Sequence, residues 1–337
     1  MLERLLFDDV PFLEVAQQEH DTFAQTLRDQ GVEVLYLEEL VAQVFDAVPE
    51  ARDEFLDQYL QEAGIKGKLF VPAVREKLNS IKDNLEFVKK TMAGLTKSEV
   101  ELPLTSSVTR NRETLYGKFI FKYHPDYKDV SLYYRRGSAF HTEGGDVLNI
   151  NEKTLAVGIS QRTQAAAIDV MAQNIFWNSD SKIERILAFD IPVSRAFMHL
   201  DTVFTQIDYD KFTIHPAIMG TLRVYELTAG KNPGDVSIKV MEDSLEHILA
   251  DATGQPAVKL IPCGGGDPIA AAREQWNDGS NTLCVSPGKI CVYQRNTVTN
   301  DVLYKEGLEL LVVPSAELSR GRGGPRCMSM PFWREDI

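Results

Sequence analysis

The chain has 337 residues, of which 44% are apolar and 25% are charged, so it is long enough to bury a sizeable core as one or two domains. Its formal net charge of -13 argues against a nucleic-acid partner and is compatible with a cationic small molecule. No apolar run reaches the roughly 18–20 residues of a membrane span, and the four cysteines show no metal-binding spacing. We therefore expect a cytoplasmic protein that binds neither nucleic acid nor a membrane.

The first hundred residues are dominated by helical periodicity. Residues 11–31 have the apolar spacing of an amphipathic helix that ends at a glycine, and VEVLYL at 32–37 predicts a strand. Between about 39 and 94, three stretches repeat the helical spacing, with Pro or Gly at the joins. This pattern predicts a small helical bundle.

From residue 101 onward, the pattern changes to alternating strands and helices. Strands are predicted at 147–151, 154–160, 185–192, 202–208, 211–216, 222–227, 257–263, 282–294 and 308–314. Helices are predicted at 163–176, 243–252, 267–276 and 297–307.

Two of these stretches are similar to each other. Residues 154–192 and 289–314 each predict a strand, a Gln-Arg-Thr or Gln-Arg-Asn segment, a helix and a second strand. A repeated strand–helix–strand unit indicates a pseudo-symmetric, propeller-like α/β assembly.

Two short segments carry candidate catalytic groups. His199 and Asp201 lie two positions apart, and in a strand such residues share a face, so they would point into one cleft as a general acid/base beside a carboxylate. Glu143 and Asp146 flank a Gly-Gly turn before a predicted strand, which suits a site at the strand mouth. The alternative for each is structural: a buried hydrogen-bonded histidine and a solvated turn.

Cysteine chemistry points to the C-terminal region. Cys284 and Cys291 lie in strand-like segments and are expected to pack in the core. Cys327 instead follows the short run RGRGGPR, which predicts a loop that presents one thiol. Arg322 and Arg326 are its candidate neighbours, and their positive charge would lower the pKa of the thiol. A cysteine, a histidine and carboxylates from separate segments are the groups needed for nucleophilic catalysis.

Six motifs in order, EGGD, AVGISQRT, MHLDTVFT, REQWNDGSNTL, YQRNTVTN and RGRGGPRCMSMP, strongly resemble bacterial arginine deiminase. The resemblance implies an α/β fold, a five-bladed pseudo-symmetric propeller of ββαβ units with an inserted all-α helical bundle. We expect residues 1–38 and 101–337 to form the catalytic propeller domain and residues 39–100 to form the bundle. The resemblance also implies a homo-oligomer with no metal and no cofactor.

The resemblance implies hydrolysis of L-arginine to L-citrulline and ammonia. Cys327 would attack the guanidinium carbon, and His199 would protonate the departing ammonia and then activate water. Asp201 would bind guanidinium nitrogens, and Glu143 would pair with His199.

The resemblance assigns the α-carboxylate of the substrate to three arginines. Arg110, Arg162 and Arg322 match these positions, where forked guanidinium donors suit bidentate binding of a carboxylate. The alternative for each is a surface or inter-blade ion pair.

The sequence departs from the family pattern in two places. The family has a strand-bearing segment before the motif that begins here at Leu2, so we expect an incomplete first blade. The family also carries a motif of the form PNLYFTRDP, whose Asp is a second guanidinium ligand, and SEVELPLTSSVTRNRETLYG passes the expected place without it. Either the protein lacks these residues or the printed sequence omits them.

Two other functions therefore remain open. A catalytically impaired arginine-binding or oligomeric scaffold would follow from the missing Asp. A related dimethylarginine hydrolase or amidinotransferase shares the same type of site, although the helical insertion and the cysteine loop favour the deiminase.

Overall fold

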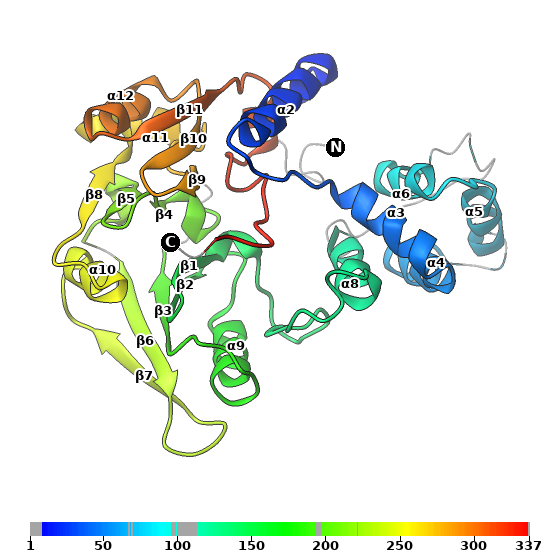
Figure 1. Cartoon of the computed structure of the whole chain (residues 1–337), viewed down its shortest axis with the longest axis horizontal. Coiled ribbons are helices and arrows are strands. Elements are labelled where there is room, and N and C mark those ends of the chain that lie inside the picture. The colour runs from blue at the N-terminus through cyan, green and yellow to red at the C-terminus, as the bar shows by residue number, and fades with distance from the viewer. Residues whose placement is uncertain are drawn as a thin grey trace. The chain divides into compact units, whose positions relative to one another are not determined.

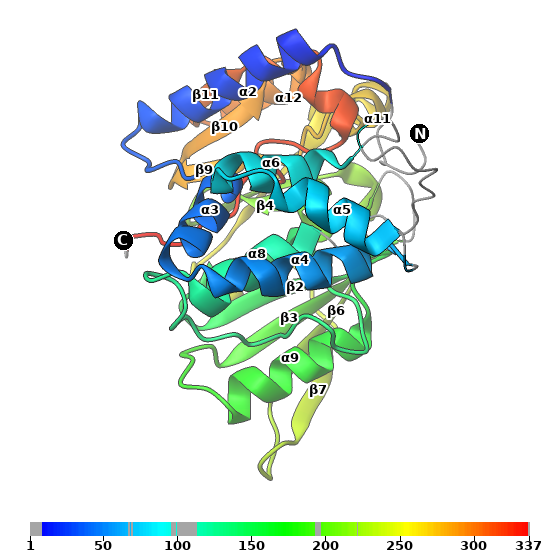
Figure 2. The ribbon, with the colours of Figure 1, turned by 90° about the vertical axis from the view of Figure 1, so that its right-hand side faces the viewer.

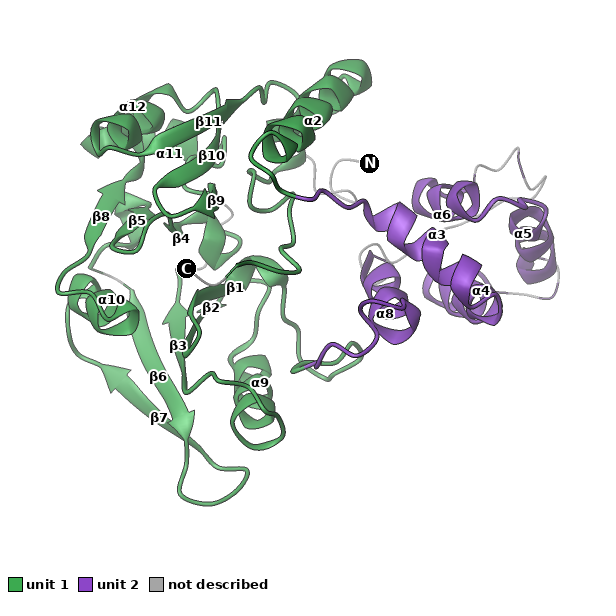
Figure 3. Cartoon of the chain, viewed as in Figure 1, with its two compact units in different colours: residues 1–32, 133–337 green, residues 33–132 purple. Residues whose placement is uncertain are grey.

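A computed structural model of the chain describes residues 9–66, 68, 70–95, 99, 113–192, 197–220 and 222–335 (Figure 1). The chain divides into two compact units (Figure 3). One comprises residues 1–32 and 133–337, and the other comprises residues 33–132. We call them the α/β unit and the helical unit. Among the described helices, none is long and apolar enough to cross a membrane.

The helical unit consists of short amphipathic helices, as the periodicity predicts. Its principal helices are α3 (Leu37–Ala47), α4 (Glu50–Glu62), α5 (Phe70–Asn79), α6 (Asn84–Ala93) and α8 (Glu113–Tyr123). The expected bounds of 39–100 leave α8 in the other domain. However, α8 buries its apolar face in the core of this unit, which explains why the unit reaches residue 132.

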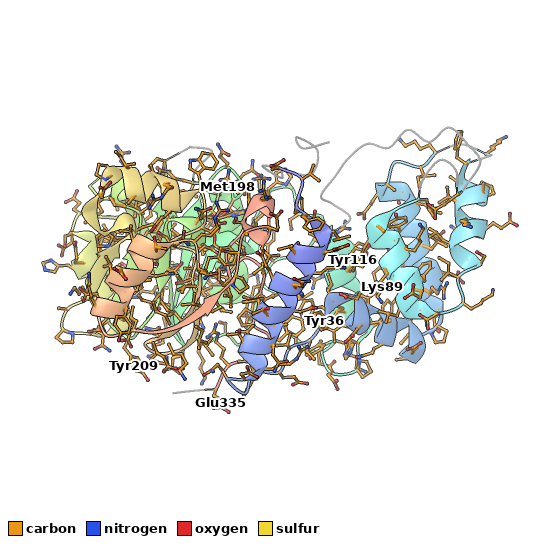
Figure 4. The ribbon with its side chains drawn as sticks, turned by 90° about the horizontal axis from the view of Figure 1, so that it is seen from above. Tyr36, Lys89, Tyr116, Met198, Tyr209 and Glu335 are labelled. Carbon is orange, nitrogen blue, oxygen red and sulfur yellow. The ribbon has the colours of Figure 1, made fainter. Side chains whose placement is uncertain are left out.

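Phe55 of α4 lies at the centre of that core. Its side chain is fully buried, and its ring centroid lies 5.3 Å from those of Phe45 and Phe119 and 5.4 Å from that of Tyr116. The side-chain view labels Tyr116 within this unit (Figure 4). Edge-to-face and tilted aromatic contacts of this kind stabilise a core beyond simple burial.

We expect Phe55→Ala to lower the free energy of unfolding by about 3–5 kcal/mol, because it opens a cavity among rings that cannot close it. Urea unfolding followed by circular dichroism measures this change. Val130→Ala, at an exposed position of the same unit, should change it by less than about 0.5 kcal/mol. Equal effects of the two substitutions would contradict the central role of Phe55.

The strand predicted at residues 32–37 is wrong. Residues 32–36 are outside regular structure, and α3 begins at Leu37. The alternation of apolar residues is present, but a strand needs a partner for its backbone groups, and none of the described strands pairs with this segment.

The α/β unit contains most of the predicted strands and helices. Its helices are α2 (Leu13–Arg28), α9 (Ala165–Trp177), α10 (Leu245–Thr253), α11 (Pro268–Gln275) and α12 (Thr297–Lys305). Its strands are β1 (Val147–Asn151), β2 (Thr154–Ile159), β3 (Arg185–Asp190), β4 (Phe204–Gln206), β5 (Lys211–Ile214), β6 (Arg223–Ala229), β7 (Val236–Met241), β8 (Lys259–Pro262), β9 (Leu283–Ser286), β10 (Lys289–Tyr293) and β11 (Glu309–Val313).

The strands form three sheets that repeat one pairing pattern. The orders are β1-β2-β3-β6-β7, β4-β5-β8 and β9-β10-β11. In each sheet the first two strands are antiparallel, and the second pairs in parallel with the third. A parallel pairing needs a long crossover, and α9 and α12 lie in two of these crossovers. The two similar stretches of sequence, 154–192 and 289–314, therefore do form the same strand–helix–strand unit.

The central strands of the five-stranded sheet are covered on both faces. Apolar residues of α9 pack with β2, β3 and β6 on one face, and Figure 2 shows α9 along these strands. On the other face, residues of β1 and β3 join a second cluster with β4, β5 and α10. The fold is thus mixed α/β.

Strand β7 is absent from the sequence-based prediction. It forms the edge of the five-stranded sheet, and its residues are mostly exposed, so it lacks an apolar run. Its alternation of Val, Ile and Val with polar residues is the signal that could have identified it.

Candidate active site

The Cys327 loop is held in place from the other end of the chain. Helix α2 packs near β11 and the 3₁₀ helix Leu318–Gly321 that follows it. The buried carboxylate of Glu19, on α2, accepts the backbone N–H groups of Ala316, Glu317 and Leu318 at 2.6, 2.9 and 2.9 Å. The loop is therefore built into the fold and is not a loose tail.

Asn281 links this loop to the segment that carries Asp201. Its side-chain oxygen accepts the N–H of Cys327 at 3.1 Å, and its side-chain nitrogen donates to the carbonyl of Asp201 at 3.1 Å. Gly324 packs so closely on Asn281 that a Cβ would lie 2.5 Å from its carbonyl oxygen. The glycine run thus allows the close approach that places Cys327. Sequence reasoning missed Asn281, although it lies within the motif REQWNDGSNTL.

His199 and Asp201 lie together, but not on a strand as expected. His199 has extended backbone and precedes the 3₁₀ helix Leu200–Thr202, and β4 begins only at Phe204. Figure 4 labels Met198, the residue before His199. A Cβ on Gly145 would lie 2.9 Å from His199 Nδ1 and 3.1 Å from Asp201 Oδ1. The Gly-Gly turn therefore packs against both groups, and only glycine fits there.

The carboxylate of Asp201 contacts both a guanidinium and the thiol. Its Oδ2 accepts from Arg326 Nη1 at 2.6 Å and lies 3.5 Å from Cys327 Sγ. Arg326 also donates from Nη2 to the carbonyl of Val147 at 2.7 Å. A planar cation already occupies one side of this fully buried carboxylate, within reach of the cysteine.

Glu143 pairs with His199, as the resemblance implies. Glu143 Oε2 lies 2.6 Å from His199 Nε2, and Arg162 Nη1 lies 3.7 Å from Glu143 Oε1. Burial of His199 lowers its pKa, but the bond that it donates to Glu143 and the charges of Asp201, Asp146 and Glu143 outweigh burial, so the pKa is raised above 6.5. The imidazole is thus biased toward its protonated, acidic form.

Two buried atoms of the site have no hydrogen-bond partner among the described residues. They are His199 Nδ1 and Asp201 Oδ1, the same two atoms that approach Gly145. Unsatisfied buried polar atoms cost free energy and are rare in folded proteins. A donor-rich, cationic ligand would satisfy Asp201 Oδ1.

The expected lowering of the Cys327 pKa is wrong. The residue is exposed at the loop surface, but its sulfur lies among many protein atoms. This desolvation and the charges of Asp201 and Asp278 raise the pKa of the thiol well above 9.0. Arg326 acts in the opposite direction, but it is paired with Asp201 and its effect is the smallest.

We expect the alkylation rate of Cys327 by iodoacetamide to keep rising through pH 9, past the ordinary thiol range near about 8.5, because only the thiolate reacts. Mass spectrometry of the Cys327 peptide measures this rate. The Cys284 and Cys291 peptides serve as internal controls, since burial raises their pKa values to about 11 and about 12. A plateau below pH 8 would contradict the environment described.

The arginines assigned to the substrate carboxylate are placed unequally. Arg162 lies beside Glu143, within the site. Arg322 lies on the Cys327 loop, with its guanidinium 4.3 Å from the ring centroid of Trp276. Arg110 lies outside the described residues. Within the described ranges, no group of three or more His, Cys, Asp or Glu is placed to hold a metal ion.

Comparison with known proteins identifies a family. The sequence model of the family described as Arginine deiminase matches residues 3–109 and 82–334. Arginine deiminase of Treponema denticola is 50% identical over 377 residues, covering 100% of this chain and 92% of the relative. The Streptococcus sanguinis enzyme of the same name is 51% identical over 381 residues, with the same coverage. A solved cyanobacterial arginine dihydrolase, ArgZ, has 15% identity and a TM-score of 0.44, over 65% of this chain and 28% of its own.

The length of these alignments differs from the length of the chain. The Treponema denticola comparison takes 377 positions to cover 337 residues, so at least 40 positions have no residue in this chain. The two matches to the family model overlap at residues 82–109. This range includes part of the stretch SEVELPLTSSVTRNRETLYG, where the Asp motif was expected.

Proposed function

Because this chain belongs to the arginine deiminase family, we propose that it hydrolyses L-arginine to L-citrulline and ammonia. One observation carries this proposal: Asp201 Oδ2 binds the guanidinium of Arg326 and also lies 3.5 Å from the Cys327 sulfur. The guanidinium of arginine would take the place of Arg326 on Asp201. Its carbon would then lie beside the sulfur that attacks it.

The first half of the reaction releases ammonia. The Cys327 thiol releases its proton to solvent and its sulfur bonds to the guanidinium carbon, giving a neutral tetrahedral adduct. The cation of the substrate offsets the charges of Asp201 and Asp278, which otherwise keep the thiol protonated. The C–N bond then breaks as His199, protonated through its pairing with Glu143, gives its proton to the departing nitrogen.

The second half consumes water. His199, now neutral, takes a proton from water, and the resulting hydroxide adds to the carbon of the thiouronium intermediate. The C–S bond breaks, the electron pair returns to sulfur, the hydroxyl proton of the adduct passes to the resulting thiolate, and citrulline leaves. Arg162, Arg322 and Arg110 are proposed to hold the α-carboxylate of the substrate.

A colorimetric citrulline assay with L-arginine tests the proposal. Production of citrulline that is lost in the Cys327→Ser protein supports it. If arginine binds but no citrulline forms, the chain is an arginine-binding scaffold. Turnover of dimethylarginine but not arginine would instead indicate the related hydrolase.

The intact mass tests the missing Asp motif. The 337 residues correspond to 37.8 kDa. A measured mass larger by several kilodaltons would show that the protein contains residues that the printed sequence lacks, as expected if the Asp motif is present. A match at 37.8 kDa would show that the protein lacks the motif that carries the second aspartate.

We further propose that the three repeated sheets belong to a five-bladed propeller, and that the protein is a cytoplasmic homo-oligomer. The shared pairing pattern of the sheets supports the propeller. Light scattering after size exclusion measures the oligomeric state.

A further inference from the structure

We propose that Asp146 is a positioning residue of this site, whose single carboxylate fixes the relative placement of the loops that carry Glu143, Arg162, His199 and Asp201. Asp146 touches none of the groups assigned to the reaction's bond changes. The sequence reasoning placed it only as an acid at a strand mouth. The inference rests on the proposed function for its kinetic test, but not for its spectroscopic one.

One oxygen of Asp146 holds the segment with His199 and Asp201. Its Oδ1 accepts the backbone N–H of Leu200 at 2.8 Å, and Leu200 lies between the two functional residues. The side chain of Asp146 is fully buried. A Cβ on Gly158 would lie 2.5 Å from this Oδ1, so β2 approaches the carboxylate as closely as a glycine permits.

The other oxygen holds the two remaining loops through hydroxyl groups. Its Oδ2 accepts from Ser160 Oγ at 2.7 Å and Thr163 Oγ1 at 2.6 Å. Ser160 Oγ in turn accepts the N–H of Arg162 at 2.9 Å, and Thr163 Oγ1 accepts the N–H of Glu143 at 3.1 Å. Each hydroxyl thus relays the position of the carboxylate to the backbone of one site residue.

Only an ionised carboxylate completes this network. Two oxygens accept three donors, whereas an amide has a single acceptor oxygen and an NH₂ group that would face a donor. Burial raises the pKa of Asp146, and the bonds from Thr163, Ser160 and Leu200 and the charge of His199 oppose that rise. The same bonds that align the site offset part of the cost of burying this charge, and the pKa of Asp146 stays above 3.8.

Asp146 also acts on His199 through its charge. The charged groups around the imidazole are Glu143, Asp201 and Asp146, with Arg162 beside Glu143 and Arg326 on Asp201. The Cys327 thiol lies 3.5 Å from Asp201 Oδ2. A negative charge at Asp146 helps to keep His199 protonated, so its removal has a signature that a loss of folding alone would not give.

The test compares Asp146→Asn with Glu274→Gln. Glu274 is also fully buried, and its carboxylate accepts from Val298 N–H, Thr299 N–H, the Thr299 hydroxyl and Arg273 Nη2, but it joins α11 to α12. We expect Asp146→Asn to lower kcat by about 10- to 100-fold and to move the alkaline limb of the pH profile to lower pH. For the protein that folds, Glu274→Gln should leave kcat and the alkaline limb of the pH profile nearly unchanged.

Two further variants keep the test decisive if Asp146→Asn does not fold. Ser160→Ala and Thr163→Val each remove one relay and keep the charge, so each should lower kcat without moving the alkaline limb. A wild-type kcat in both Ser160→Ala and Thr163→Val would overturn the proposal. The same kcat in Asp146→Asn as in Glu274→Gln would also overturn it.

The His199 pKa is also measured directly by NMR of the imidazole. This titration needs no turnover. If the wild-type protein makes no citrulline, the proposed function is contradicted, but the effect of Asp146 on the His199 pKa can still be measured. A fall of the His199 pKa in Asp146→Asn supports the proposal, and an unchanged pKa contradicts it.

Discussion

Replacing Cys327 with serine is expected to lower citrulline formation by about 1,000-fold or more, because the reaction would lose its nucleophile. A hydroxyl is harder to ionise than a thiol, and the charge of Asp201 lies beside it. The citrulline assay at saturating arginine measures the loss.

The matched control is Cys284→Ser, because Cys284 is a free thiol at some distance along the chain that burial keeps protonated. That variant should keep the activity of the parent. The melting temperature of Cys327→Ser should stay within a few degrees of the wild type, which separates loss of chemistry from loss of fold. Substantial activity in Cys327→Ser would remove the covalent mechanism.

Asp201→Asn is expected to lower kcat/KM for arginine by about 100- to 1,000-fold. The neutral amide cannot balance the charge of a substrate guanidinium in a buried position, so both binding and orientation suffer. The same change leaves Arg326 without its carboxylate partner. Steady-state kinetics over a range of arginine concentrations measures kcat and KM separately.

Asp208→Asn is the control for this experiment. Asp208 is a mostly buried aspartate that pairs with Lys211 at 2.7 Å. The Asp208→Asn substitution therefore removes an ion pair without changing Cys327 or His199. Its kinetics should match the wild type. If the two variants behave alike, Asp201 is not the guanidinium ligand.

The sequence was sufficient to predict features that depend on local pattern. Helices of the helical unit follow the 3.6-residue spacing of their apolar residues, and α9 and α12 lie within repeated strand–helix–strand units. The approach of His199 to Asp201 was also predicted, although through a strand. In the structure a 3₁₀ turn brings them together around Gly145.

Features that depend on partners distant in the sequence could not be predicted in this way. Residues 32–36 have a strand-like pattern but no strand beside them, and β7 has a partner but a weak pattern. The Arg326 charge suggested a lowered pKa of the Cys327 thiol, but burial and the charge of Asp201 reverse the direction. The links made by Asn281 and Asp146 use hydrogen bonds between segments that the sequence separates.

The anchoring of the Cys327 loop by Glu19 has a consequence for synthesis of the chain. Glu19 emerges from the ribosome 297 residues before Ala316, whose N–H it accepts. The Glu19 carboxylate can therefore bind this N–H group only after almost the whole polypeptide has been translated. The Cys327 loop thus gains this support only after the two ends of the chain have met, and we expect a tag that prevents α2 from docking to lower the activity of Cys327.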